Sequence, residues 1–258
     1  DPIDLRVDRN RLIIAGRAED LTAAEALELT AALTRHFADD GIFFCAPTPS
    51  HWYLRTARVP RLVTTPLPSA VNRSITHHLP RGDDALAWHR VMNEAQMILH
   101  AHAVTAAREA RGAQPANSIW LWGGGTLPAH LQRPYTEAGS DEPLTRALAN
   151  AASVPHTGLP ASGADWLAAS SGGSHLIVID APSAALRAGN IASWRQQIEL
   201  LDENWVCPLL GALRAKKITG LALVACNNES LLQSALARAD LWRFWRRARP
   251  LAEYACHA

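Results

Sequence analysis

Residues 115–125 read PANSIWLWGGG, in which the short apolar run Ile119–Trp122 leads directly into three consecutive glycines. Such a run predicts a buried strand that ends in a tight turn. Two further apolar runs, 175–180 and 218–225, follow along the chain with helical patterns between them. Strands that alternate with helices are typical of a parallel sheet with helices on both faces. The second part of the chain is therefore predicted to have an α/β fold.

Helical periodicity marks several segments around these strands. Thr22–Glu25 has the spacing of a capping box and predicts the start of a helix, as does Ser193–Gln196. Apolar positions that end at His102 predict one helix over residues 84–110 and place this histidine in the core. A last helix is expected to follow the third strand as far as about Arg247.

The composition is that of an ordinary globular protein, with 48% hydrophobic and 19% charged residues among 258. Residues 60–82 carry four prolines and no strong period, which suggests a connection between domains. We therefore expect a smaller α+β domain over residues 1–80 and an α/β domain over residues 81–258.

Charge and cysteine usage exclude several classes of protein. A formal net charge of +1 gives no electrostatic reason to expect nucleic acid, a membrane or an acidic partner. The four cysteines lie far apart, which argues against a zinc site or a disulfide framework and suits a reducing cytosol. No apolar run approaches the roughly 20 residues that span a bilayer, and no signal peptide is visible. These features predict a soluble, cytoplasmic protein.

Candidate ligand groups follow each of the three expected strands, where ligands gather in open α/β sheets. Gly123–Gly125 could bring backbone N–H groups close to an anion, or could simply form a tight turn. Asp180 could bind a ligand, although its surroundings favour a helix cap or a turn. Cys226–Asn228 offers a thiol and two amides but no charged ligand.

Two other features have an ordinary explanation that competes with a functional one. Eleven histidines are present, but none has a recognised metal-binding spacing. The segment Arg238–Arg249 mixes arginines with aromatic residues, as nucleic-acid-binding segments do. At helical spacing the same residues give an apolar core face and a solvated arginine face, which the near-zero net charge favours.

Several motifs resemble those of archaeal-type cofactor-independent phosphoglycerate mutases, members of the alkaline phosphatase superfamily. Residues 115–125 resemble that family's Ala-Asn-x-Ile-Trp-x-x-Gly-x-Gly segment. His102–Arg108 is similar to its His-Pro-Val-Asn-x-x-Arg motif, with Ala103 and Thr105 departing from it. The whole chain more closely resembles the bacterial RpfE-type proteins, which are named as regulators. The resemblance implies an alkaline-phosphatase-like α/β core, a parallel sheet with helices on both faces, and a smaller inserted α+β domain.

The chemistry of the mutases requires two divalent ions, which activate a nucleophile and clamp the phosphoryl oxygens. The resemblance implies that one ligand pair is an aspartate followed four residues later by histidine. Here Asp180 is followed by Ala184. The other pair, an adjacent Asp-His, corresponds to Cys226–Asn228, and in the family order the nucleophile segment would precede residue 1.

The sequence therefore predicts a non-catalytic phosphoglycerate-mutase-like protein, a pseudoenzyme with a regulatory or ligand-sensing role. We expect no catalytic residue, no metal and no cofactor, and a small phosphorylated metabolite or a protein as partner. The alternatives are a metal-dependent phosphoglycerate mutase or phosphomonoesterase and, ranked last, a nucleic-acid-binding regulator. The expected ligand-binding residues are Trp122, Gly123, Gly124, Gly125, Arg108 and Asp180.

Overall fold

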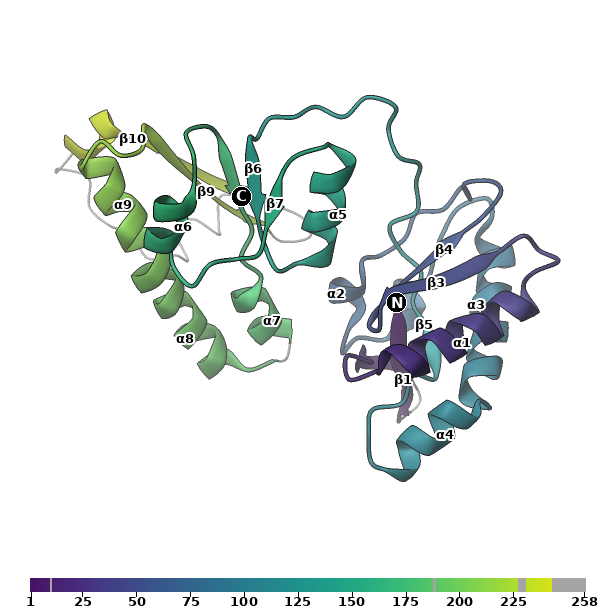
Figure 1. Ribbon diagram of the computed structural model, residues 1–258. Coiled ribbons are helices and arrows are strands. Elements are labelled where there is room, and N and C mark those ends of the chain that lie inside the picture. Colours follow the sequence, from purple (N-terminus) through teal and green to yellow (C-terminus); the bar gives the residue numbers. More distant parts are fainter. Residues whose placement is uncertain (10, 188, 227–230, 243–258) are drawn as a thin grey trace. The chain divides into compact units, whose positions relative to one another are not determined.

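The computed structural model describes residues 1–9, 11–187, 189–226 and 231–242 (Figure 1). The chain divides into two compact units, residues 1–127 and 128–258. The boundary lies farther along the chain than the position near residue 80 that the prolines suggested. The proline-rich segment belongs to the first unit, because Val63 pairs with Arg81 and Val71 forms a bridge with Ile14.

Two antiparallel sheets and several helices make up the first unit. One sheet has the strand order β2-β1-β5, and the other pairs β3 with β4. The strands are β1 (Pro2–Asp8), β2 (Arg11–Arg17), β3 (Phe43–Thr48), β4 (His51–Arg55) and β5 (Ser118–Ile119). The helices are α1 (Ala23–His36), α2 (Leu67–Ala70), the 3₁₀ turn η1 (Ile75–His77), α3 (Ala85–His100) and α4 (Ala103–Ala110).

The predicted capping box at the start of α1 is confirmed. The Thr22 hydroxyl accepts a hydrogen bond from the Glu25 N–H at 3.2 Å, and the Glu25 carboxylate accepts one from the Thr22 N–H at 2.9 Å. The apolar face of α1 carries Leu29 and Leu33, which are fully buried in the core of the first unit. The apolar positions that predicted this helix are therefore the ones that pack into the core.

The helix predicted over residues 84–110 is in fact two helices. α3 ends at His100 and α4 begins at Ala103. His102 has an extended backbone and caps α4, with its Nδ1 atom accepting a hydrogen bond from the Val104 N–H at 3.2 Å. The prediction of a core histidine was wrong because the chain turns at this residue.

The strand predicted at Ile119–Trp122 is shorter and pairs differently than expected. Only Ser118 and Ile119 form β5, which lies antiparallel to β1 with Ile119 opposite Pro2. β5 therefore belongs to the first unit rather than to a parallel sheet. The pairing joins two ends of a long segment, and no local pattern reveals it.

The second unit contains a parallel sheet, but of the three strands predicted for it only residues 175–180 contribute, as the strand His175–Ile177. Its order is β7-β6-β8, and the central strand pairs in parallel with both neighbours. The strands are β6 (Glu137–Gly139), β7 (His156–Thr157) and β8 (His175–Ile177), and the intervening helices are α5 (Pro143–Ala151) and α6 (Gly163–Ala169). A mixed α/β architecture with a parallel sheet is thus present, although only part of the second half takes part in it.

The rest of the second unit departs further from the prediction. The elements are α7 (Ala181–Arg187), α8 (Ile191–Leu201), the π-helical turn η2 (Asp202–Val206), α9 (Cys207–Arg214), β9 (Gly220–Cys226), β10 (Leu231–Ala237) and the 3₁₀ turn η3 (Arg238–Trp242). β9 pairs antiparallel with β10, so a strand stands where a helix was expected. α8 begins earlier than predicted, because Asn190 caps it by accepting from the Ser193 N–H at 2.9 Å. Asn227, Asn228 and the segment from residue 243 onward, including Arg246 and Arg247, lie outside the described residues.

Within the described ranges, no helix combines the length and apolar character needed to cross a bilayer.

Candidate functional site

The glycine segment leaves the core of the first unit immediately after β5. Trp120 is buried, and its indole N–H donates to the Thr65 carbonyl at 2.9 Å. Trp122 is 37% exposed, and Gly123 follows with a φ of +70°, a left-handed conformation that favours glycine. The Gly123 N–H donates to the Thr64 hydroxyl at 3.3 Å. The segment is thus fixed at its start and open beyond it.

A cluster of polar side chains, which we call the Trp122 cluster, surrounds the start of this segment. It consists of Asp1, Arg17, His51 and Trp122. One oxygen of Asp1, Oδ2, accepts from Arg17 Nη2 at 3.0 Å and from Trp122 Nε1 at 2.9 Å. Arg17 Nη1 lies 2.9 Å from His51 Nε2. The cluster therefore brings β2, β4 and the glycine segment together.

The contacts of His51 define its tautomer. A guanidinium has only donors, so Nε2 of His51 must accept the bond from Arg17. The proton then sits on Nδ1, which lies 3.1 Å from the hydroxyls of both Thr48 and Ser50. A neutral His51 thus orients the guanidinium of Arg17. No motif in the sequence connects Arg17 and His51 with Trp122. Sequence reasoning could have selected Arg17 only because arginine is common at anion sites.

The backbone beyond Gly123 offers further donors. The N–H groups of Gly124 and Gly125 make no hydrogen bond to any described residue. Both glycines are exposed, and a side chain at either position would meet no atom within 4 Å. Backbone N–H groups and arginine guanidinium groups are both used at anion sites, and these two glycines follow Trp122, whose indole shares Asp1 Oδ2 with Arg17.

Arg108, the predicted ligand-binding arginine, lies elsewhere in the first unit and is fully buried. Its Nε donates to the Gln114 carbonyl at 2.9 Å, and Nη1 donates to Glu25 Oε2 at 3.0 Å. Its Nη2 donates to the Asp20 carboxylate. The guanidinium is thus occupied by acceptors of the protein and holds α4 to the start of α1.

The same network changes the acidity of Glu25. Burial alone raises the pKa of this carboxyl, but hydrogen bonds from Thr22 and Arg111, with the charge of Arg108, outweigh burial and lower the pKa from 4.5 to about 2. Because the pKa is lower in the folded protein, the contribution to stability is complete above about pH 4.5. It is lost as the pH falls toward 2.

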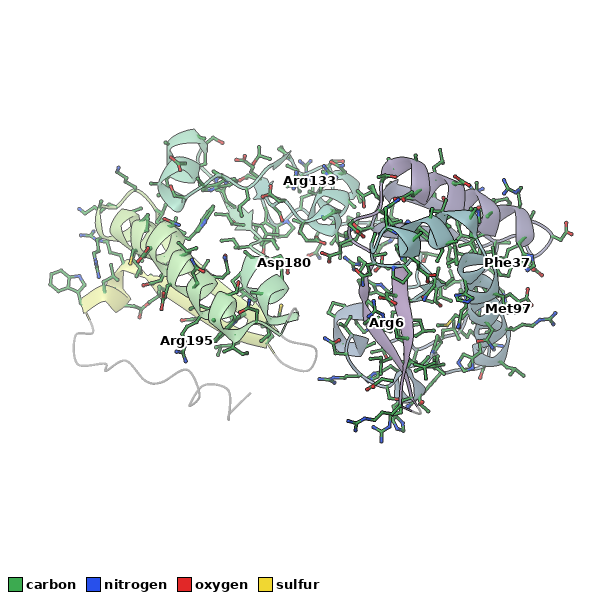
Figure 2. The ribbon with its side chains drawn as sticks, turned by 90° about the horizontal axis from the view of Figure 1, so that it is seen from below. Arg6, Phe37, Met97, Arg133, Asp180 and Arg195 are labelled. Atoms are coloured by element: carbon green, nitrogen blue, oxygen red, sulfur yellow. The ribbon has the colours of Figure 1, made fainter. Side chains whose placement is uncertain are left out.

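Asp180 lies in the second unit, between β8, which ends at Ile177, and α7, which begins at Ala181 (Figure 2). Its backbone carbonyl accepts from the Ala184 N–H at 3.0 Å, as expected at the start of a helix. Asp141, which follows the neighbouring strand β6, accepts from the Leu159 N–H at 3.0 Å. The carboxyl ends of the parallel strands thus carry two aspartates, and the sequence pattern identified only the first.

The donor set around Asp180 does not fit two divalent ions. In the described part of the chain, no three side chains of His, Cys, Asp or Glu gather in a way that could hold a metal. Ala184 occupies the position where the mutase pattern has histidine. A dinuclear site needs several carboxylate or imidazole ligands. The described residues do not provide them.

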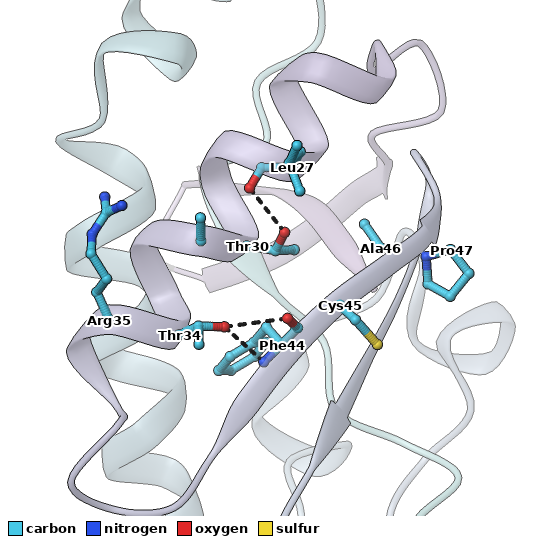
Figure 3. Close-up of a pocket in the computed structure, with 9 residues that line it drawn as sticks. Leu27, Thr30, Thr34, Arg35, Phe44, Cys45, Ala46 and Pro47 are labelled. Carbon is cyan, nitrogen blue, oxygen red and sulfur yellow. Dashed lines mark hydrogen bonds between the residues drawn. The ribbon is translucent and has the colours of Figure 1, made fainter.

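An open hollow of about 590 Å³ lies between α1 and β3, and none of the predicted site residues lines it (Figure 3). Its walls are mainly apolar, including Leu27, Ala31 and Phe44. The Thr34 hydroxyl accepts from the Phe44 N–H at 2.9 Å and donates to its carbonyl at 3.2 Å. Thr34 thus satisfies the backbone of β3 at this point, and the hollow has few polar groups to orient a ligand.

Comparisons with known proteins agree with the resemblance seen in the motifs. No protein-family model matches the chain. The 2,3-bisphosphoglycerate-independent phosphoglycerate mutase of Methanothrix thermoacetophila is 30% identical over 214 residues, which cover 76% of this chain and 54% of that protein. The 2,3-bisphosphoglycerate-independent phosphoglycerate mutase 2 of Methanothermobacter thermautotrophicus is 29% identical over 133 residues, covering 51% and 33%.

Among solved structures, the cofactor-independent phosphoglycerate mutase of Thermoplasma acidophilum aligns with 79% of this chain and 60% of its own. The sequence identity is 13% and the TM-score 0.39. The chain spans about half the length of the Methanothrix mutase and about a third of the length of the Methanothermobacter mutase. At modest identity, the chain is homologous to cofactor-independent phosphoglycerate mutases.

Proposed function

We propose that this chain is a non-catalytic, phosphoglycerate-mutase-like protein that binds a small phosphorylated acid at the Trp122 cluster. Its role would be regulatory or ligand-sensing, in line with the RpfE-type resemblance. One observation carries the proposal: the chain is similar to a mutase over 76% of its length, yet the described residues do not form with Asp180 the ligand set that two metal ions require. A protein that keeps the scaffold and loses the metal ligands is suited to binding rather than turnover.

The choice of a phosphorylated acid rests on the donors at the Trp122 cluster. Arg17 offers a guanidinium, and Gly124 and Gly125 offer two adjacent N–H groups. Phosphate oxygens accept from guanidinium and from backbone N–H groups, and both kinds of bond are charge-assisted. Asp1 now neutralises Arg17, so an arriving phosphate would compete with this carboxylate for the guanidinium. Arg108 and Asp180 have no part in this proposal.

The absence of turnover rests on what phosphoryl transfer requires. Catalysis of this reaction comes from positioning and from metal ions and cations that stabilise the charge of the transition state. Enzymes lower such barriers by at least about 8 kcal/mol. A loss of even one hydrogen-bond donor that stabilises the transition state costs about 3–4 kcal/mol, so the loss of charged metal ligands should cost more.

Replacing Arg17 with glutamine should weaken binding of 3-phosphoglycerate, measured by isothermal titration calorimetry, by about 10- to 100-fold. The reason is that a hydrogen bond to a charged group contributes about 1.5–3 kcal/mol. Arg90→Gln is the matched control, since it makes the same charge change at an exposed position on α3. Inorganic phosphate serves as a second probe for the anion alone.

The Arg90 variant should bind as the unaltered chain does, and circular dichroism should show both variants folded. Equal binding by the Arg17 variant, or no measurable binding of either probe by the unaltered chain, would contradict the proposed site.

A further inference from the structure

Positive charge is concentrated in the last part of the chain. Residues 211–249 carry eight lysines and arginines but only two acidic residues, Glu229 and Asp240. The net charge of +1 for the whole chain therefore conceals an uneven distribution. An anionic partner responds to the local charge of a surface, so this region differs from the rest of the chain.

The fold brings four of these cations together in the second unit. Arg214 ends α9, and Lys216 and Lys217 follow it closely. Arg238 begins η3, which contacts α9 and follows the end of β10 that pairs with the start of β9 (Figure 1). Residues that are distant in the sequence thus meet at one end of the β9–β10 hairpin. We call Arg214, Lys216, Lys217 and Arg238 the basic cluster.

The cations of the basic cluster are available to a partner. All four residues are exposed, and none of their side chains has a hydrogen bond or an ion pair with another described residue. The dipole of α9 favours cations at the end of that helix, but Arg238 lies outside it. Helix stability therefore does not account for the whole cluster.

An exposed indole lies in the same turn as Arg238. Trp242 is the last residue of η3 and is 73% exposed. The helical pattern of this segment predicted an apolar face in the core. For Trp242 that prediction was wrong, because residues 238–242 follow β10 as a short 3₁₀ turn. An aromatic ring in water beside several cations is typical of surfaces that bind single-stranded nucleic acid, where phosphates contact the cations and bases stack on the ring.

We propose that the basic cluster and Trp242 bind single-stranded nucleic acid. Phosphates of the strand contact the four cations, and one base stacks on the indole of Trp242. Binding does not depend on the base sequence, because no base edge is read. The site shares no residue with the Trp122 cluster and is separate from the phosphorylated-acid site proposed there.

The test is the binding of a fluorescently labelled oligothymidylate of about 16 nucleotides, followed by anisotropy over a range of salt concentrations. The unaltered chain should bind it, and the logarithm of the affinity should fall with the logarithm of the salt concentration by about 0.7 for each phosphate contact. The double variant Lys216→Gln, Lys217→Gln removes two contacts, so this slope should become shallower by about 1.4.

Trp242→Ala should weaken binding of the same oligonucleotide by about 5- to 150-fold, the effect of losing one stacked base. The salt slope should stay as it is, because no charge is removed. Binding of a duplex of the same length should not change, since its bases are already stacked on each other and none is offered to the indole.

The controls make the same chemical changes in the first unit. Arg11→Gln with Arg73→Gln removes two exposed cations, and Tyr53→Ala removes an aromatic side chain that is 46% exposed on β4. Both controls should bind the oligonucleotide as the unaltered chain does, and circular dichroism should show every variant folded.

Three results would overturn the proposal. The first is an unaltered chain that does not bind the oligonucleotide at low salt. The second is a salt slope that is the same in the double lysine variant, or an affinity that is the same in Trp242→Ala. The third is binding of heparin or of phosphatidylglycerol vesicles without binding of the oligonucleotide, which would indicate a different polyanion or a membrane surface.

Discussion

Replacing Arg108 with methionine should lower the free energy of unfolding of the first unit by about 3–5 kcal/mol. The guanidinium is fully buried and bonds to Gln114, Asp20 and Glu25. Methionine fills much of the volume but removes one donor from each of these acceptors, and Glu25, whose side chain is only 14% exposed, then keeps only Thr22 and Arg111. Urea denaturation followed by circular dichroism measures the loss.

Arg111→Met is the matched control for this prediction. Arg111 bonds to the same carboxylate, Glu25, but its side chain is half exposed. Exposed ion pairs contribute about 0–1 kcal/mol, so the control should lose no more than that. Equal losses from both variants would contradict a buried structural role for Arg108.

Replacing Gly139 with alanine should destabilise the second unit by about 1–3 kcal/mol, the usual cost of overpacking. Gly139 lies in the central strand of the parallel sheet, and an added Cβ would stand 2.6 Å from Cζ3 of Trp166. Trp166 is buried, so its ring cannot move aside without exposing apolar surface. Thermal unfolding followed by circular dichroism measures the shift.

Gly211→Ala is the control, since a Cβ at this position in α9 meets no atom within 4 Å. Alanine is the better helix former by about 1 kcal/mol. This variant should therefore be as stable as the unaltered chain or slightly more so. If Gly139→Ala were equally harmless, the close packing of Trp166 on the sheet would be wrong.

Features that depend on neighbouring residues could be predicted from the sequence, whereas pairings between distant segments could not. The capping box of α1 needs only residues 22–25, and it appears as predicted. β5 depends on pairing with β1, more than one hundred residues earlier, and periodicity carries no such information. The apolar run of β9 correctly predicted a strand, but not that its partner would be antiparallel.

The candidate site shows the same division. The glycines after Trp122 are visible as a motif, whereas Arg17 and His51 join them only through the fold. Arg108 was expected at the ligand because of a motif, and its burial beneath α1 could not be read from spacing. Burial, rather than residue type, decides whether an arginine serves a ligand or the core.

The interconversion of 3- and 2-phosphoglycerate tests the central claim most directly. A coupled mutase assay with added manganese should be run on the natural protein that contains these residues, with an archaeal mutase as the positive control. We expect no conversion above the background rate, because the described residues do not supply the ligands of two metal ions. Manganese-dependent turnover that is lost in the Asp180→Ala variant would contradict it.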